Sequence, residues 1–198
     1  MKNKWLVKMA AAASLVFATS ASAAIVSYDL SGDGRNIGSP ETFESDGLEM
    51  TARSQVERYG RWRSGGTLYQ TSRGLGVYNG WGDSTQVDGI GRDEAILFSF
   101  DSAVELVGAA FGSLSSNDDF NLAVYNNGWT TVLDDERSLG GTYVGTAFRF
   151  WANFFDDDFY VKGLTFDDSP KAVPEPATLV LLGLGLVAVG ISRRQTKA

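Results

Sequence analysis

The stretch EAILFSF at residues 94–100 carries the clearest secondary-structure signal in this chain. Ile96, Phe98 and Phe100 recur at every second position, which places three large apolar side chains on one face of an extended strand. Such alternation is typical of a strand that buries one face in a hydrophobic core.

A second run follows directly at residues 104–112, where Val107, Ala109 and Phe111 share one face. Short alternating or aromatic-rich runs, separated by clusters of Gly, Asn, Asp and Ser, continue in both directions, and helical periodicity is absent between the two ends of the chain. The further strands predicted in this way cover residues 25–30, 48–52, 55–62, 67–71, 75–78, 120–125, 129–133, 141–155 and 159–166.

Many short strands with turn signals about every 8–12 residues favour an all-β fold. We predict a two-sheet β-sandwich, jelly-roll-like, for one domain at residues 24–168, with residues 169–173 as a linker. On the strand predicted at residues 141–155, Phe148, Phe150, Ala152 and Phe154 form the apolar face.

The N-terminus has the three parts of a secretory signal peptide. Lysines at positions 2, 4 and 8 precede an alanine-rich apolar run, and Ala21-Ser22-Ala23 gives the small-residue cleavage pattern. We predict that residues 1–23 are removed after Ala23, with Ala24 as the alternative cleavage point. An uncleaved N-terminal membrane anchor is the other interpretation.

The C-terminus also has three parts in a fixed order. Pro174-Glu175-Pro176 comes first, an apolar run without charge occupies residues 178–191, and Arg193 and Arg194 begin a basic end. The prolines fix φ and remove backbone donors, so this segment stays extended. The apolar run is short for a membrane-spanning helix, which needs about 20 residues, but it suffices if Arg193 snorkels. The arginines place the C-terminus in the cytoplasm.

This tail, residues 174–198, resembles the PEP-CTERM sorting signal of Gram-negative bacteria that make exopolysaccharide. The resemblance implies that an exosortase recognises Pro174, Glu175, Pro176 and the basic residues Arg193 and Arg194, and removes the tail. It also implies a protein held briefly in the inner membrane and finally placed at the cell surface or outside the cell. Residues 75–80 and 86–100 resemble a pattern of such surface proteins, which implies no assigned reaction. A plain C-terminal anchor is the alternative.

Charge and composition exclude several classes of function. Residues 24–176 hold all 24 acidic residues but 11 of the 17 basic ones, a formal charge of −13, so we expect no nucleic-acid partner. The chain has no Cys and no His, which rules out disulfides, Ser-His-Asp and Cys-His nucleophiles and zinc sites of Cys or His. We expect no catalytic residues; a carboxylate-based glycan hydrolase is the weaker alternative.

Acidic side chains gather in and around the polar loop at residues 79–92 and in a later turn. Carboxylates in glycine-rich loops are the ligands that calcium prefers, although Asp and Gly are also common in solvated turns that bind nothing. The run Asp156–Asp158 reads more simply as a turn. The calcium ligands we predict are Asp83, Asp88, Asp93, Asp118 and Asp119, and Glu94 lies beside them in the sequence.

Aromatic residues beside polar loops suggest a second kind of site. Flat rings next to Asp and Asn suit the faces of sugars, and Trp81 and Trp129 are the predicted carbohydrate contacts. Ordinary packing at the edge of the core is the alternative for both.

Together these patterns indicate an exported surface or extracellular-matrix protein of the exopolysaccharide or biofilm layer with a structural or adhesive role. The alternative is a carbohydrate-binding module, with calcium as a possible cofactor. The expected partners are the general secretion machinery, signal peptidase, the exosortase, and an extracellular polysaccharide.

Overall fold

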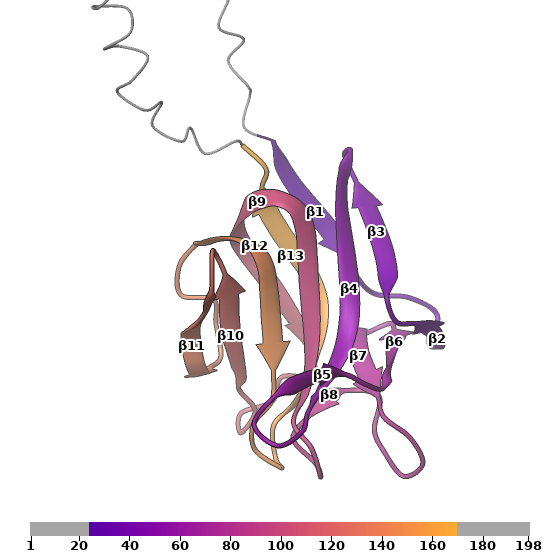
Figure 1. The fold of residues 1–198 in the computed structure, drawn as a ribbon. Helices are drawn as coiled ribbons and strands as arrows, with labels where there is room; N and C mark the ends of the chain where they lie inside the picture. The colour runs from indigo at the N-terminus through magenta and orange to yellow at the C-terminus, as the bar shows by residue number, and fades with distance from the viewer. Residues whose placement is uncertain (1–23, 170–198) are drawn as a thin grey trace, which may run out of the picture.

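A computed structural model describes residues 24–169, and every regular element among them is a β-strand (Figure 1). The predicted all-β class is confirmed. The signal peptide, the apolar C-terminal segment and the sorting signal lie outside the described residues. Within residues 24–169, no helix has the length and apolarity needed to cross a membrane.

The thirteen strands vary widely in length. They are β1 (Ile25–Asp29), β2 (Arg35–Gly38), β3 (Glu41–Ser45), β4 (Leu48–Glu57), β5 (Trp62–Ser64), β6 (Thr67–Thr71), β7 (Gly74–Tyr78), β8 (Val87–Asp88), β9 (Glu94–Gly112), β10 (Phe120–Tyr125), β11 (Trp129–Glu136), β12 (Tyr143–Trp151) and β13 (Asp158–Asp167).

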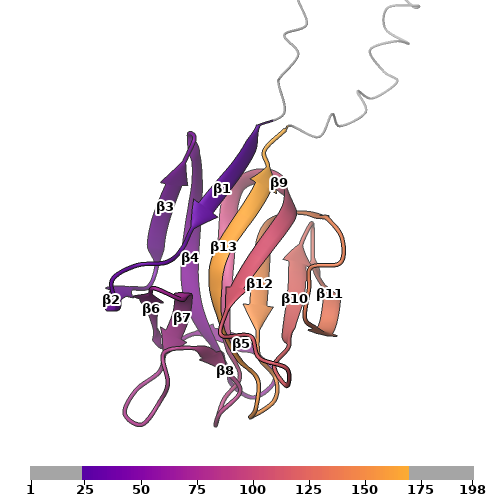
Figure 2. The ribbon, with the colours of Figure 1, turned by 180° about the vertical axis from the view of Figure 1, so that it is seen from behind.

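Strand β9 is the centre of the sheet. Its first half pairs antiparallel with β4 on one side and β12 on the other, and its second half pairs with β13 and, at residues 104–106, with β12. The three residues 101–103 between these halves are exposed. Figures 1 and 2 show β9 arching over one end of the domain, so that the sheet folds back on itself around the core.

The predicted division into two jelly-roll sheets is not confirmed. Pairing runs without a break in the order β11-β10-β12-β9-β13-β7-β6-β2, and the remaining strands join this path to give one thirteen-stranded antiparallel sheet. The runs at residues 94–100 and 104–112, predicted as separate strands, form one strand. Strand β12 pairs with both parts of this strand, Ala147 with Ser99 and Gly145 with Val104, and the register shifts between these two pairs at the bend.

The core consists largely of phenylalanine rings held between the two halves of the folded sheet. Ile96, Phe98 and Phe100 are all buried, as their alternation predicts. The ring centroid of Phe150 on β12 lies 6.1 Å from that of Phe98 and 5.8 Å from that of Phe120. Such edge-on and tilted pairs add to the free energy gained by removing the rings from water.

Two predicted face assignments are wrong. Val107 does not share the core face with Phe111. Leu106 pairs with Phe166 and Gly108 pairs with Thr165, and the β-bulge between these two pairs shifts the alternation of faces along β9. Leu106 therefore faces the core in place of Val107.

Phe154 is also outside the core, because β12 ends at Trp151 and the chain turns before it reaches that residue. More than half of the Phe154 side chain is exposed.

The two ends of the described domain lie side by side. The Ala24 amide donates to Asp168 Oδ1 at 3.2 Å, and the Asp168 amide donates to the Ala24 carbonyl at 3.1 Å. Strand β1 pairs with β13 next to this contact. The long connection between β7 and β9 lies at the opposite end of the domain (Figures 1 and 2).

The ring cluster predicts a large loss of stability on truncation. Phe150→Ala should lower the free energy of unfolding by about 3–5 kcal/mol, because the cavity it leaves is surrounded by other rings. Urea unfolding followed by tryptophan fluorescence measures the change. Phe155→Ala is the matched control, since Phe155 is 78% exposed and its loss should change stability by less than about 0.5 kcal/mol. Equal effects of the two substitutions would contradict the assigned core.

Candidate functional site

The connection at residues 79–93 is packed tightly against its neighbours. A Cβ on Gly76 of β7 would lie 2.0 Å from the Thr85 carbonyl oxygen, and one on Gly89 would lie 2.2 Å from the Phe154 carbonyl oxygen. Glycine at both positions lets the backbone of this connection approach the sheet closely. The Val77 amide also donates to the Gln86 carbonyl at 3.3 Å. The acidic side chains of the connection are therefore held by a well-defined backbone.

Asp83 lies in the turn that follows β7. Its amide donates to the Gly80 carbonyl at 3.1 Å, and the Asn79 amide donates to its carboxylate. Gly80 and Gly82 both have positive φ angles, 127° and 87°, which glycine adopts without strain. The turn thereby fixes the direction of the Asp83 side chain.

Asp88 ends the short strand β8, which pairs with the beginning of β13. Ser84 Oγ donates to Asp88 Oδ2 at 2.7 Å, and the Ile90 amide donates to Oδ1 at 2.9 Å. The side chain is 1% exposed. Burial raises the pKa of the Asp88 carboxyl, and the two hydrogen bonds oppose that rise.

Glu94 is the first residue of β9 and is also 1% exposed. The Asp88 amide is hydrogen-bonded to its carboxylate, but Oε2 is buried without a hydrogen-bond partner. Burial, together with the charges of Asp83 and Asp88, raises the pKa of Glu94 to about 9. An ionised Glu94 therefore needs a positive charge close to it.

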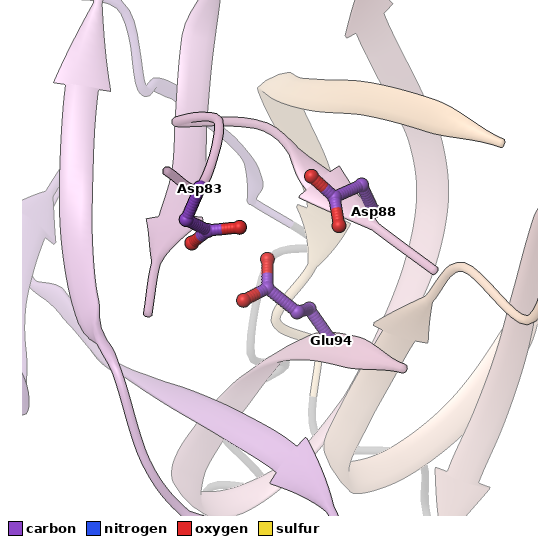
Figure 3. A group of neighbouring side chains, drawn as sticks. All are labelled: Asp83, Asp88 and Glu94. Carbon is purple, nitrogen blue, oxygen red and sulfur yellow. The ribbon is translucent and has the colours of Figure 1, made fainter. Parts of the chain in front are cut away.

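The three carboxylates point toward one another (Figure 3). One oxygen from each of Asp83, Asp88 and Glu94 lies within 4.8 Å of the others. Such a set of oxygen atoms can hold a hard cation, and burial of two of the three side chains limits their exchange with water.

Asp93 does not join this group of three carboxylates. It lies in a different pocket together with Glu57, Arg58 and Arg92. Neighbouring residues on an extended backbone point to opposite sides, which separates Asp93 from Glu94. Glu94, like Ile96 and Phe98, stands at every second position of the strand and therefore shares their face. The alternation that predicts the strand thus also predicts an acidic side chain on its core face.

The other two predicted ligands lie outside this group of three carboxylates: Asp119 is in a second acidic group beside Asp157, and the charge of Asp118 acts on Asp158. The Asp119 amide donates to Asp157 Oδ1 at 3.3 Å, and Asp119 Oδ1 is buried without a hydrogen-bond partner. Burial, followed by the charges of Asp157, Asp135 and Asp156, raises the pKa of Asp119 to about 6, and Arg137 opposes the rise. Calcium binding by Asp93, Asp118 and Asp119 stays a prediction without support from this geometry.

Trp81 lies in the loop after β7 and is fully exposed. It lines an open pocket of about 320 Å³ that also includes Asp83, Ile90 and Arg92. An exposed indole beside polar groups can stack on a flat ligand.

Trp129 lies at the start of β11 and is 42% exposed. The Arg149 guanidinium carbon lies 4.0 Å from the centroid of the Trp129 ring and 5.3 Å from that of Trp62. Arg149 Nε also donates to Gln55 Oε1 at 2.8 Å, and burial lowers the pKa of Arg149 to about 10, so it stays charged at neutral pH. We call this set of side chains, in which Arg149 contacts both Trp129 and Trp62, the aromatic row.

The two predicted sugar contacts do not form one site. Trp81 lies in the loop after β7, whereas Trp129 begins β11 and its ring packs against Arg149 of β12. The sequence places Trp62 among the aromatic residues beside polar loops, but it gave no means of finding Arg149, because the folding of the sheet brings β5, β11 and β12 together.

Comparison with known proteins identifies one segment of the chain. Residues 172–194 match the family model of the PEP-CTERM protein-sorting motif. No curated protein and no solved structure matches the chain. The predicted sorting motif is thereby confirmed, and it indicates an exosortase-targeted surface protein. The match covers the tail and does not extend into the β domain.

The second acidic group predicts a pH dependence of stability. The folded-state pKa of Asp119, about 6, exceeds its ordinary value of 3.8, so the folded state favours the protonated carboxyl. The stability that protonated Asp119 contributes is fully present below pH 3.8 and is lost as pH rises through about 6. Asp119→Asn should therefore raise the melting temperature by a few degrees at pH 8, and the difference from the wild type should vanish near pH 4.

Thermal unfolding in chelator at both pH values measures this difference, since no cation then contributes. The matched control is Asp134→Asn, which removes one acidic charge from an exposed position of β11. A gain of the same size at pH 4 as at pH 8 would show that the effect does not arise from ionisation of Asp119.

Proposed function

We propose that this chain is exported, processed by an exosortase and retained in the extracellular polysaccharide or biofilm layer, where its β domain has a structural or adhesive role. The observation that carries the proposal is the PEP-CTERM motif at residues 172–194, which begins shortly after β13 ends. Exosortase is the processing partner that this motif implies.

The arrangement of the domain supports this route. Cleavage after Ala23 would leave Ala24 as the new N-terminus, at the position where its nitrogen lies 3.2 Å from Asp168 Oδ1. The signal peptide and the sorting tail therefore join the domain at the same end. While Arg193 and Arg194 hold the tail in the inner membrane, the loops at the opposite end are free to meet other molecules.

A non-catalytic role fits the environment of the most perturbed carboxyl group. The pKa of Glu94, about 9, would suit a general acid, but a side chain that is 1% exposed cannot contact a glycosidic oxygen of a bound polysaccharide. A glycan hydrolase is for this reason the weaker proposal.

The second candidate function is a carbohydrate-binding module. The exposed Trp81 and the partly exposed Trp129 of the aromatic row favour it, because indole faces stack on sugar rings, and the buried Arg149 holds the Trp129 ring in place from one side. The two positions lie on different parts of the domain, so we propose two separate contacts with one long polymer.

The sorting motif predicts the fate of a tail variant. Replacing Pro174, Glu175 and Pro176 with alanine should leave a longer species in the membrane fraction, because the extended segment that the exosortase reads is lost. Intact mass of the protein from each cell fraction measures this outcome. Pro170→Ala, a proline upstream of the matched segment, should be processed normally. Normal processing of the triple variant would refute recognition through this motif.

The carbohydrate alternative predicts retardation in native gels that contain the polysaccharide of the producing cell. Trp81→Ala and Trp129→Ala should each weaken binding about 2–10-fold, the range for loss of one aromatic stacking contact. Phe155→Ala removes an exposed ring that lies outside both proposed contacts, so this variant should bind like the wild type. Absence of retardation for the wild type would exclude this candidate and leave the structural role.

A further inference from the structure

We propose that Asp83, Asp88 and Glu94 bind one calcium ion, which fastens the connection at residues 79–93 to the start of β9. This inference concerns the β domain and does not depend on how the tail is processed. Nothing in the match at residues 172–194 bears on it.

The first support is the buried oxygen that the protein leaves without a partner. Glu94 Oε2 makes no hydrogen bond, although its side chain is 1% exposed and points toward Asp83 and Asp88 (Figure 3). Burying an unpaired carboxylate oxygen costs several kcal/mol, so natural proteins pair such groups or use them to coordinate metals. A cation between the three carboxylates satisfies this oxygen.

The second support is the spacing of the ligand atoms. Calcium binds oxygen at about 2.3–2.6 Å, so ligands on opposite sides of the ion are about 4.6–5.2 Å apart and adjacent ligands are closer. The three carboxylate oxygens all lie within 4.8 Å of one another. They therefore fit on the surface of one calcium coordination sphere with little movement.

The third support is the way each ligand is held. Asp88 is oriented by Ser84 and Ile90, and the Asp83 carboxylate accepts from the Asn79 amide. Each hydrogen bond fixes its carboxylate but leaves lone pairs on the same oxygens for a metal. Glu94 is positioned by the pairing of β9 with β4.

The chemistry of the group selects calcium among the common cations. All three ligands are oxygen atoms, and the chain has no Cys or His, the ligands that zinc and copper prefer. Magnesium keeps several waters and is usually held by one or two carboxylates, whereas calcium accepts more carboxylates in flexible geometry. Burial of Asp88 and Glu94 leaves little room for the waters of a magnesium ion.

Binding would connect parts of the chain that nothing covalent links. Asp83 belongs to the turn that carries Trp81, Asp88 belongs to β8 beside β13, and Glu94 begins the central strand. A chain without cysteine has no disulfide to close such a loop. Calcium at the millimolar concentrations typical of extracellular fluids would stabilise the loop only after export, since extracellular modules bind it with dissociation constants of about 10⁻⁴–10⁻³ M.

The test uses the full-length chain, purified in mild detergent and stripped with a chelator. Isothermal titration with calcium chloride should show one site. Calcium at 100 times its dissociation constant should raise the melting temperature by about 5–10 °C. Magnesium at the same concentration should raise it less, and an equal effect of magnesium would overturn the assignment to calcium.

Two variants distinguish coordination from a general effect of charge. Glu94→Gln should lose the calcium-dependent shift, yet in chelator it should melt at or above the wild-type temperature, because it removes a buried carboxyl. Asp93→Asn removes an acidic charge from the adjacent residue, outside the group, and should keep the full shift.

Asp83→Asn, on the half-buried turn, provides a second ligand variant and should also lose most of the shift. A wild-type protein with neither binding heat nor a calcium-dependent shift would overturn the proposal. So would an undiminished calcium response in Glu94→Gln, or an equal loss in Asp93→Asn.

Discussion

The hydrogen bonding of β9 to strands on both halves of the sheet is the interaction on which the rest of the domain depends. Its first half lies between β4 and β12, and its second half pairs with β13, the strand that also holds β1, β7 and β8. Because one strand serves both halves, the phenylalanine rings between them are enclosed by a sheet that cannot open without breaking these ladders. Substitutions in this core are therefore expected to affect the whole domain at once.

The same strand begins with the most unusual side chain of the domain. Glu94 occupies a position on the core face that an apolar residue would fill at lower cost, and it has Asp83 and Asp88 as neighbours. Three acidic groups at one end of a hydrophobic core oppose folding unless they are protonated or share a cation. The packing of the core provides the stability that allows this local arrangement to persist.

The domain has two different ends, and this polarity relates the fold to the function. Ala24 and Asp168 meet at one end, where residues 1–23 and the tail with the PEP-CTERM motif join the domain. The connection that carries Trp81 and the three carboxylates lies at the other end. A protein tethered through its tail would present this connection to its surroundings, which is consistent with a surface role.

The sequence by itself determined the all-β class, the buried face of residues 94–100 and the sorting motif, because each depends on local spacing or on a contiguous pattern. Only the tertiary structure decided that the runs on either side of residues 101–103 form one strand, that a bulge moves Val107 off the core face, and that Glu94 replaces Asp93 among the grouped carboxylates. These features depend on pairing register and on side chains distant in the sequence. The alternation of residues constrains which face a side chain takes, but it does not specify which strand lies opposite.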